Sequence, residues 1–174
     1  MNAAQIINQT SGRTEWYTPP AIIEAARRTL GQIDLDPASC EYANRIVRAN
    51  HYYTAADDGL GWHWYANTIW LNHPFGRESN PAWIGKLIDG FQRKHFHAAC
   101  CITFACTSEE WFGPLFAFPM CFLRPRTNYL KSDGEPVRGV TKGSVVTYLG
   151  SNVIGFIENF GGLGAVMLPM EVGQ

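Results

Sequence analysis

The residues best placed to do chemistry follow a short apolar run. Thr68 to Leu71 has the β-branched and aromatic content of a buried strand, and Asn72, a histidine, a proline and Phe75 come directly after it. Pro74 removes a backbone donor, so the strand must end and deliver Asn72 into a turn at its carboxyl end, where open α/β sheets bind ligands. An amide there can accept from and donate to a planar amino-heterocycle, and Phe75 offers a face for stacking. Asn-x-Pro is also ordinary turn chemistry.

A second candidate is the carboxylate of Asp36. It ends a brief alternating strand that starts at Ile33, and a turn of small residues follows it. A carboxylate in this position can hydrogen-bond a ribose or an amino group of a nucleoside cofactor. Asp36 could equally cap a helix over residues 41–50, and the sequence leaves both interpretations open.

A third group of candidates is basic. Residues 128–142 are polar and glycine-containing, and they follow a strand over Met120 to Leu123. They form either a mobile basic loop that contacts an anionic partner or an ordinary surface hairpin. The cations on and before this segment are Arg124, Arg126, Lys131, Arg138 and Lys142.

Metal chemistry is not expected. Asp57 and Asp58 stand side by side before a glycine, but such pairs usually face water, and no histidine falls at a ligand spacing from them. Of Trp62, Trp64 and Trp70, most should pack in a core, although a partly exposed one could stack on a base.

The elements that must position these residues alternate between helices and strands. A helix over Ala21 to Leu30 has Thr18 as its predicted N-cap and prolines in its first turn, and Gly31 ends it. Further helices are expected from Ser79 or Asn80 through Phe91, and after Thr107 or Ser108. Apolar strands are expected over residues 96–105, 120–123 and 144–149. Such alternation predicts an α/β fold with a mostly parallel sheet covered by helices.

Composition limits the possible classes of protein. The 174 residues are 46% hydrophobic and 17% charged, which predicts one folded domain over residues 14–174 after a flexible arm over residues 1–13. The net charge of -1 means that nucleic acid would have to bind through a local patch. The five cysteines lack CxxC pairing, and no signal peptide or membrane span is apparent. We therefore expect reduced thiols in a cytoplasmic protein.

Four motifs in order resemble the phage-type DNA N-6-adenine methyltransferase family. They are Trp16-Tyr17-Thr18-Pro19-Pro20, Leu35-Asp36-Pro37-Ala38-Ser39, Asp57-Asp58-Gly59-Leu60 and Leu71-Asn72-His73-Pro74-Phe75-Gly76, and the likeness extends over about residues 14–160. The resemblance implies a single-domain, Rossmann-like fold that uses S-adenosylmethionine to methylate the exocyclic amino group of a DNA adenine, as a monomer or a homodimer.

The resemblance also implies roles for individual residues. Cofactor contacts would come from Tyr17, Thr18, Pro19, Asp36, Pro37, Ala38 and Asp58. Asn72, the backbone of His73, Pro74 and Phe75 would form the catalytic turn, in which Asn72 Oδ1 and the His73 carbonyl accept the two hydrogens of the adenine amino group and Phe75 stacks on the flipped base. The basic residues named above would contact DNA.

The chain departs from the family pattern at two points. His73 stands where the family has proline, so the turn loses a rigid residue and gains a titratable ring. The cofactor turn after Asp36 also lacks a Gly-x-Gly pattern. Two alternatives therefore remain: another phage DNA base-modifying enzyme on the same fold, and a non-catalytic DNA- or protein-binding module with a decayed site.

Overall fold

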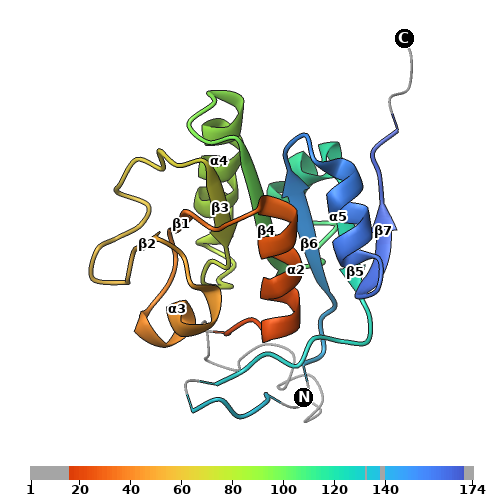
Figure 1. The fold of residues 1–174 in the computed structure, drawn as a ribbon, viewed down its shortest axis with the longest axis horizontal. Helices are drawn as coiled ribbons and strands as arrows, with labels where there is room; N and C mark the ends of the chain where they lie inside the picture. Colours follow the sequence, from red (N-terminus) through yellow and green to blue (C-terminus); the bar gives the residue numbers. More distant parts are fainter. Residues whose placement is uncertain (1–15, 132, 138–139, 171–174) are drawn as a thin grey trace.

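A single seven-stranded sheet organises the molecule. The computed structural model describes residues 16–131, 133–137 and 140–170 of the 174-residue chain, and its strands lie in the order β2-β1-β3-β4-β6-β5-β7 (Figure 1). The predicted arm over residues 1–13 lies outside the described residues. The strands are β1 (Leu35–Asp36), β2 (His51–Tyr52), β3 (Thr68–Leu71), β4 (Ala98–Phe104), β5 (Met120–Leu123), β6 (Ser144–Leu149) and β7 (Gly164–Met167).

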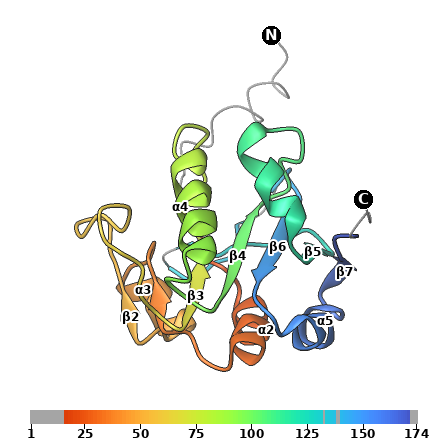
Figure 2. The same ribbon diagram turned by 90° about the horizontal axis from the view of Figure 1, so that it is seen from above.

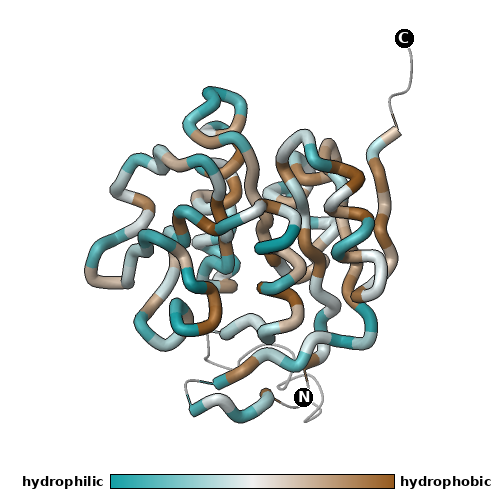
Figure 3. The backbone as a smooth tube through the Cα atoms, viewed as in Figure 1, coloured by the Kyte–Doolittle hydropathy of each residue, from teal (hydrophilic) through white to brown (hydrophobic). Residues whose placement is uncertain are grey.

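Helices cover both faces of this sheet. Figure 2 shows α2 (Pro20–Leu30), α3 (Glu41–Val47) and α5 (Val153–Phe160) on one side, and α4 (Asn80–Gln92) with the 3-10 helix η1 (Glu110–Ala117) on the other. Each side has its own apolar core, one around Trp70 and Tyr148 and the other around Trp64 and Leu87. Hydrophobic residues accordingly follow the strands and helices in Figure 3, whereas the outer loops are more hydrophilic. The predicted α/β class is confirmed.

The sheet is mixed rather than mostly parallel, which corrects the prediction. Strands β2, β1, β3 and β4 pair in parallel, whereas β6 is antiparallel to β4 and to β5, and β7 is antiparallel to β5. A parallel neighbour needs a crossover, usually through a helix. The connection from β5 to β6 over residues 124–143 contains no helix in its described part, so β6 returns alongside β5 in the opposite direction.

Helix starts account for two further corrections. Pro19, not Thr18, is the N-cap of α2, and no side chain caps this helix. Cys40 caps α3 through its sulfur, which accepts from the Ala43 amide at 3.4 Å, so Asp36 is not the cap that one interpretation allowed. The segment after Ser108 is a 3-10 helix rather than an α-helix, and Pro114 lies inside it. Its Phe112 and Leu115 are buried as expected.

Three elements were missed by the sequence analysis. His51 and Tyr52, for which no strand was expected, form the edge strand β2 beside β1. The glycine-rich end of the chain contains α5, capped by Asn152 Oδ1 at the Gly155 amide, and the strand β7. The signal for α5 was present, since an asparagine precedes an apolar octet that ends at Gly161.

Three of the five cysteines lie in the interior of the fold. All five cysteines are free, and Cys100, Cys101 and Cys121 are buried. Burial raises the pKa of the Cys121 thiol to about 11. Within the described ranges, no helix combines the length and apolarity that crossing a membrane would require.

The loop over residues 53–67 is held near Gly59 by one hydrogen bond within the loop and one to α4. Trp64 Nε1 donates to the Gly59 carbonyl at 2.8 Å, and Lys86 Nζ of α4 donates to the Leu60 carbonyl at 2.7 Å. Gly59 itself lies so close to the turn after β1 that an added Cβ would come within 1.9 Å of the Pro37 carbonyl oxygen. Gly59 is therefore required for close backbone approach, which brings Asp58 next to the end of β1.

Replacing Gly59 by alanine should destabilise the protein. We expect Gly59→Ala to lower the free energy of unfolding by roughly 1–3 kcal/mol, because the methyl group forces the loop away from Pro37. Urea denaturation measures the change. The control is Gly85→Ala on the exposed face of α4, where nothing lies within 4 Å of an added Cβ and stability should rise by about 0.5–1 kcal/mol. Equal effects of the two substitutions would contradict this packing.

Candidate active site

The candidate site lies at the carboxyl ends of β1 and β3. The chain runs from β1 through α3 to β2 on one side, and from β3 through α4 to β4 on the other, so the crossovers leave for opposite faces between β1 and β3. Such a switch point opens a crevice at the carboxyl ends of the strands. Asp36 ends β1, Asn72 follows β3 and Phe104 ends β4, so all three lie at this edge.

This crevice contains a cavity of about 220 Å³. Six of the seven residues predicted for cofactor contacts line it, namely Tyr17, Thr18, Asp36, Pro37, Ala38 and Asp58, whereas Pro19 does not and instead caps α2. Asn72, His73 and Pro74 of the predicted catalytic turn also line it. The fold therefore brings two sets of residues, predicted separately, to one cavity.

Sequence reasoning missed part of the cavity wall. The apolar side of α3 contributes Ala43, Ile46 and Val47, and Trp83 of α4 lies opposite. An apolar stripe on a short helix is usually core packing, so the sequence carried no signal that separates these residues from ordinary core.

Asp36 is the one carboxylate buried at the cavity. It is 1% exposed, and its Oδ1 accepts from the Ala38 amide at 3.2 Å. Burial raises the pKa of Asp36 to about 7, and the Ser39 side chain and the Ala38 amide oppose the rise. At neutral pH the group is therefore poised between its neutral and charged forms, and a cation in the cavity would favour the charged form. Asp58, by contrast, is exposed.

Thr18 adds a second buried polar group. Its side chain is 5% exposed, and Oγ1 has no hydrogen-bond partner among the described residues. A buried hydroxyl without a partner costs free energy, so its retention in a cavity wall favours a ligand as the missing partner.

The amide of Asn72 is held in one orientation by the backbone of Trp16. Asn72 Nδ2 donates to the Trp16 carbonyl oxygen at 2.6 Å. A carbonyl oxygen only accepts, so the nitrogen must face it and Oδ1 must face away. Asn72 is half-buried, and no described residue donates to its Oδ1. The site therefore presents a fixed amide acceptor at the end of β3.

The carbonyl oxygens of His73 and Pro74 differ in their hydrogen bonding. The Pro74 oxygen accepts from the Gly76 amide at 2.8 Å and from Ser79 Oγ at 3.3 Å, and His73 Nδ1 lies 3.0 Å from it. In contrast, no described residue donates to the His73 oxygen. Two acceptors are thus left for a ligand on consecutive residues, Asn72 Oδ1 and the His73 carbonyl.

Phe75 lies in an aromatic cluster beside these acceptors. Its ring centroid is 4.5 Å from that of Phe104 and 5.8 Å from that of Tyr129, and Trp16 contacts both of these rings. Tyr129 is fully buried, whereas Phe75 and Phe104 remain partly exposed. The cluster gives Phe75 a rigid backing and leaves part of its ring accessible for stacking.

One protein family matches most of the chain. The family described as DNA N-6-adenine-methyltransferase (Dam) matches residues 7–151, which is most of the chain. The chain belongs to this family. No curated protein shows significant sequence similarity to it. The Dam match includes Thr18, Asp36, Asp58 and the turn that begins at Asn72, so the resemblance inferred from the four motifs is confirmed.

The basic residues of this Dam family member lie beside the same edge of the sheet. The described parts of the segment from Arg124 to Lys142 run along the lower side of the molecule in Figure 1, and Leu130 forms a two-way backbone bridge with Tyr17, next to Thr18. Arg124, Arg126 and Lys142 are exposed and Lys131 is partly buried, while Arg138 lies outside the described residues. The Lys142 ammonium lies 5.6 Å from the centre of the Phe104 ring.

The remaining predicted features are less involved in the site. Trp62 is 56% exposed but stacks on Tyr53, and its Nε1 donates to the Asp57 carbonyl. Asp57 accepts from Thr54 and so closes its own turn. Among the described residues, no group of three histidine, cysteine or acidic side chains is arranged to hold a metal ion.

The pKa of Asp36 predicts a pH-dependent stability. Between about pH 4 and pH 7 the unfolded chain has ionised this carboxyl while the folded chain keeps its proton, so stability falls as the pH rises through this range. Asp36→Asn removes the penalty and retains an acceptor for the Ala38 amide. It should raise the free energy of unfolding by roughly 1–3 kcal/mol more at about pH 8 than at about pH 5.

Urea denaturation at the two pH values measures this difference. The exposed Asp133→Asn serves as the matched control, because an asparagine there can still accept from the Glu135 amide. An effect of Asp36→Asn that is the same at both pH values would contradict the buried, protonated state of Asp36.

Proposed function

We propose that this protein binds S-adenosylmethionine in the cavity beside Asp36 and methylates the exocyclic N6 amino group of a DNA adenine that has flipped out of the helix. The observation that carries the proposal is the fixed Asn72 amide, whose Oδ1 and the adjacent His73 carbonyl are two acceptors without donors among the described residues. An adenine amino group has two hydrogens to donate to them. Membership of the Dam family supplies the reaction class.

The methyl transfer does not require a strong catalytic base. The lone pair of the adenine amino nitrogen is delocalised into the ring, so the nitrogen is a poor nucleophile. Accepting both of its hydrogens at Asn72 Oδ1 and the His73 oxygen favours a pyramidal nitrogen whose lone pair points at an electrophile. These acceptors stabilise positive charge as it develops on the nitrogen, and a proton then leaves to water.

The cavity fits the cofactor by the chemistry of its walls. S-adenosylmethionine would supply an electrophilic methyl group on a positively charged sulfur. The buried Asp36 carboxylate would offset positive charge of the cofactor, the unpartnered Thr18 hydroxyl would gain a hydrogen bond, and α3 would provide an apolar wall. Asp58 at the cavity edge is a candidate for ribose contact. We further propose that Pro37 and Ala38 take the place of the family's glycine-rich turn in a Rossmann-like arrangement.

The flipped base would lie between the two acceptors and the partly exposed ring of Phe75. Phe104 and Tyr129 pack against that ring, so little conformational entropy is lost when the base stacks. The exposed cations Arg124, Arg126 and Lys142 would contact phosphates beside the target, with Lys131 and Arg138 on the same segment. They would act on affinity rather than on the choice of base.

Asn72 tests the mechanism directly. We expect Asn72→Ala to reduce kcat for methyl transfer by about a hundredfold or more, because one of the two acceptors is lost, while S-adenosylmethionine still binds. Calorimetry with the cofactor and transfer of a labelled methyl group to DNA measure the two effects separately. Full methyl transfer by Asn72→Ala would contradict the mechanism. Failure of the unsubstituted protein to bind the cofactor, with and without DNA, would instead favour a non-catalytic module.

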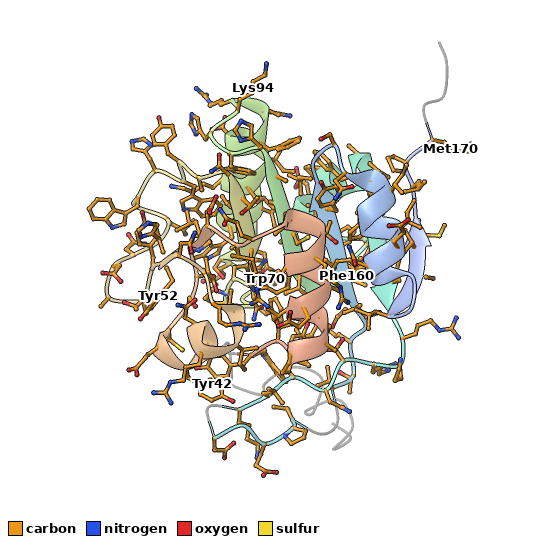
Figure 4. All side chains as sticks on the ribbon, viewed as in Figure 1. Tyr42, Tyr52, Trp70, Lys94, Phe160 and Met170 are labelled. Carbon is orange, nitrogen blue, oxygen red and sulfur yellow. The ribbon has the colours of Figure 1, made fainter. Side chains whose placement is uncertain are left out.

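The basic segment gives a separate prediction for DNA binding. Arg124→Gln and Arg126→Gln should each weaken binding and reduce the slope of log K against log salt by about 0.9, the value for one phosphate contact. Fluorescence anisotropy of a labelled DNA measured over a range of salt concentrations gives the slope. Lys94→Gln is the control, because Lys94 is exposed at the opposite end of the molecule (Figure 4). Unchanged slopes in both arginine variants would remove this segment from the interface.

A further inference from the structure

We infer that the His73 side chain is a positioning residue, which replaces the rigidity of the family's proline by fixing the turn from Asn72 to Gly76 through a hydrogen bond to the Pro74 carbonyl. This inference rests on the proposed function and assigns a role to the ring, whereas the proposed mechanism uses only the backbone of His73. It explains how a turn with a flexible residue at this position can still present two acceptors in a defined geometry.

The contacts of the ring come from two elements. His73 is 2% exposed, and its ring is nearly parallel to Trp83 of α4, with centroids 6.3 Å apart and 12° between the planes. It meets Phe75 edge to face at 5.5 Å and 86°. The ring thus links α4 to the catalytic turn, and its position affects both the carbonyl at residue 73 and the stacking ring at residue 75.

The hydrogen bond determines where the ring proton lies. His73 Nδ1 is 3.0 Å from the Pro74 oxygen, which only accepts, so Nδ1 carries the proton and Nε2 does not. Nε2 is buried and has no partner among the described residues. Burial lowers the pKa of His73 to about 4, and the Pro74 carbonyl opposes this shift. The ring is therefore neutral near neutral pH and is a weak base.

The same hydrogen bond helps to hold the Pro74 oxygen within the turn. That oxygen already accepts from the Gly76 amide and lies near Ser79 Oγ, so the carbonyl points into the turn. The His73 oxygen, to which no described residue donates, remains as the second acceptor. Losing the ring's donor would free the turn to rotate, and misplacement of reacting groups by about 1 Å can cost about a hundredfold in rate.

Substitution of His73 by asparagine or by glutamine tests the roles of its two ring nitrogens separately. His73→Asn places a nitrogen near the position of Nδ1 and can still donate to Pro74, whereas His73→Gln places one near the position of Nε2 and cannot. We expect His73→Gln to lower kcat on the order of tenfold to a hundredfold, and His73→Asn to stay within about threefold of the unsubstituted protein. The dissociation constant for S-adenosylmethionine should change by less than about threefold in both variants.

The control is His97→Gln, which changes an exposed histidine before the amino end of β4, at the edge of the sheet opposite the site. It should leave kcat and cofactor affinity unchanged. Equal losses of kcat in the Asn and Gln variants would overturn the inference. So would a loss of cofactor affinity with kcat unchanged, since His73 would then be a cofactor ligand.

A second measurement does not depend on methyl transfer. In protein labelled with ¹⁵N-histidine, long-range ¹H–¹⁵N correlation spectra near neutral pH should show His73 protonated at Nδ1 and unprotonated at Nε2. A ring protonated at Nε2, or at both nitrogens, would overturn the inference even if a variant fails to fold. Absence of methyl transfer by the unsubstituted protein would instead contradict the proposed function, and the spectrum would still decide the role of the ring.

Discussion

The hydrogen bond between Asn72 Nδ2 and the Trp16 carbonyl is the contact on which the rest of the site depends. It joins the end of β3 to the segment before α2, and that segment is itself held by the backbone bridge between Tyr17 and Leu130. Three parts of the chain that are far apart in sequence are thereby fixed around one amide. Because the Trp16 oxygen can only accept, the orientation of Asn72 follows without any contribution from a ligand. The acceptor is preorganised, which is the condition for electrostatic stabilisation of a transition state.

Asn72 also lies between two different electrostatic environments. The cavity on one side contains Asp36, whose burial makes it costly to ionise until positive charge arrives. The surface on the other side carries exposed arginines on the segment after β5. A cationic cofactor suits the first environment and an anionic polymer suits the second. The net charge of -1 does not reveal this separation, because the separation depends on where the charged residues lie and not on how many there are.

The sequence predicted Asp36 and Asn72 as candidate residues, because Asp36 ends a strand and Asn72 follows one in a locally recognisable way. The strand before Asn72 and its termination by Pro74 were readable from apolar content and from proline geometry, and the structure places β3 over the same residues. The direction of β6 and β7 was not readable, since it depends on pairing between distant segments. Thr18 was predicted as a helix cap because threonine favours that position, but the α2 helix begins two residues later. The orientation of the Asn72 amide is set by a residue 56 positions earlier, which no local pattern encodes.

The most direct measurement is the mass of the nucleosides released from DNA that has been incubated with the protein and S-adenosylmethionine carrying a deuterated methyl group. The account predicts deoxyadenosine with the labelled methyl group on N6 and no label on the other nucleosides. Label on another base would contradict the assignment of Asn72 and the His73 carbonyl to an adenine amino group. DNA that stays unlabelled, although the cofactor binds to the protein, would contradict the claim that this site methylates DNA.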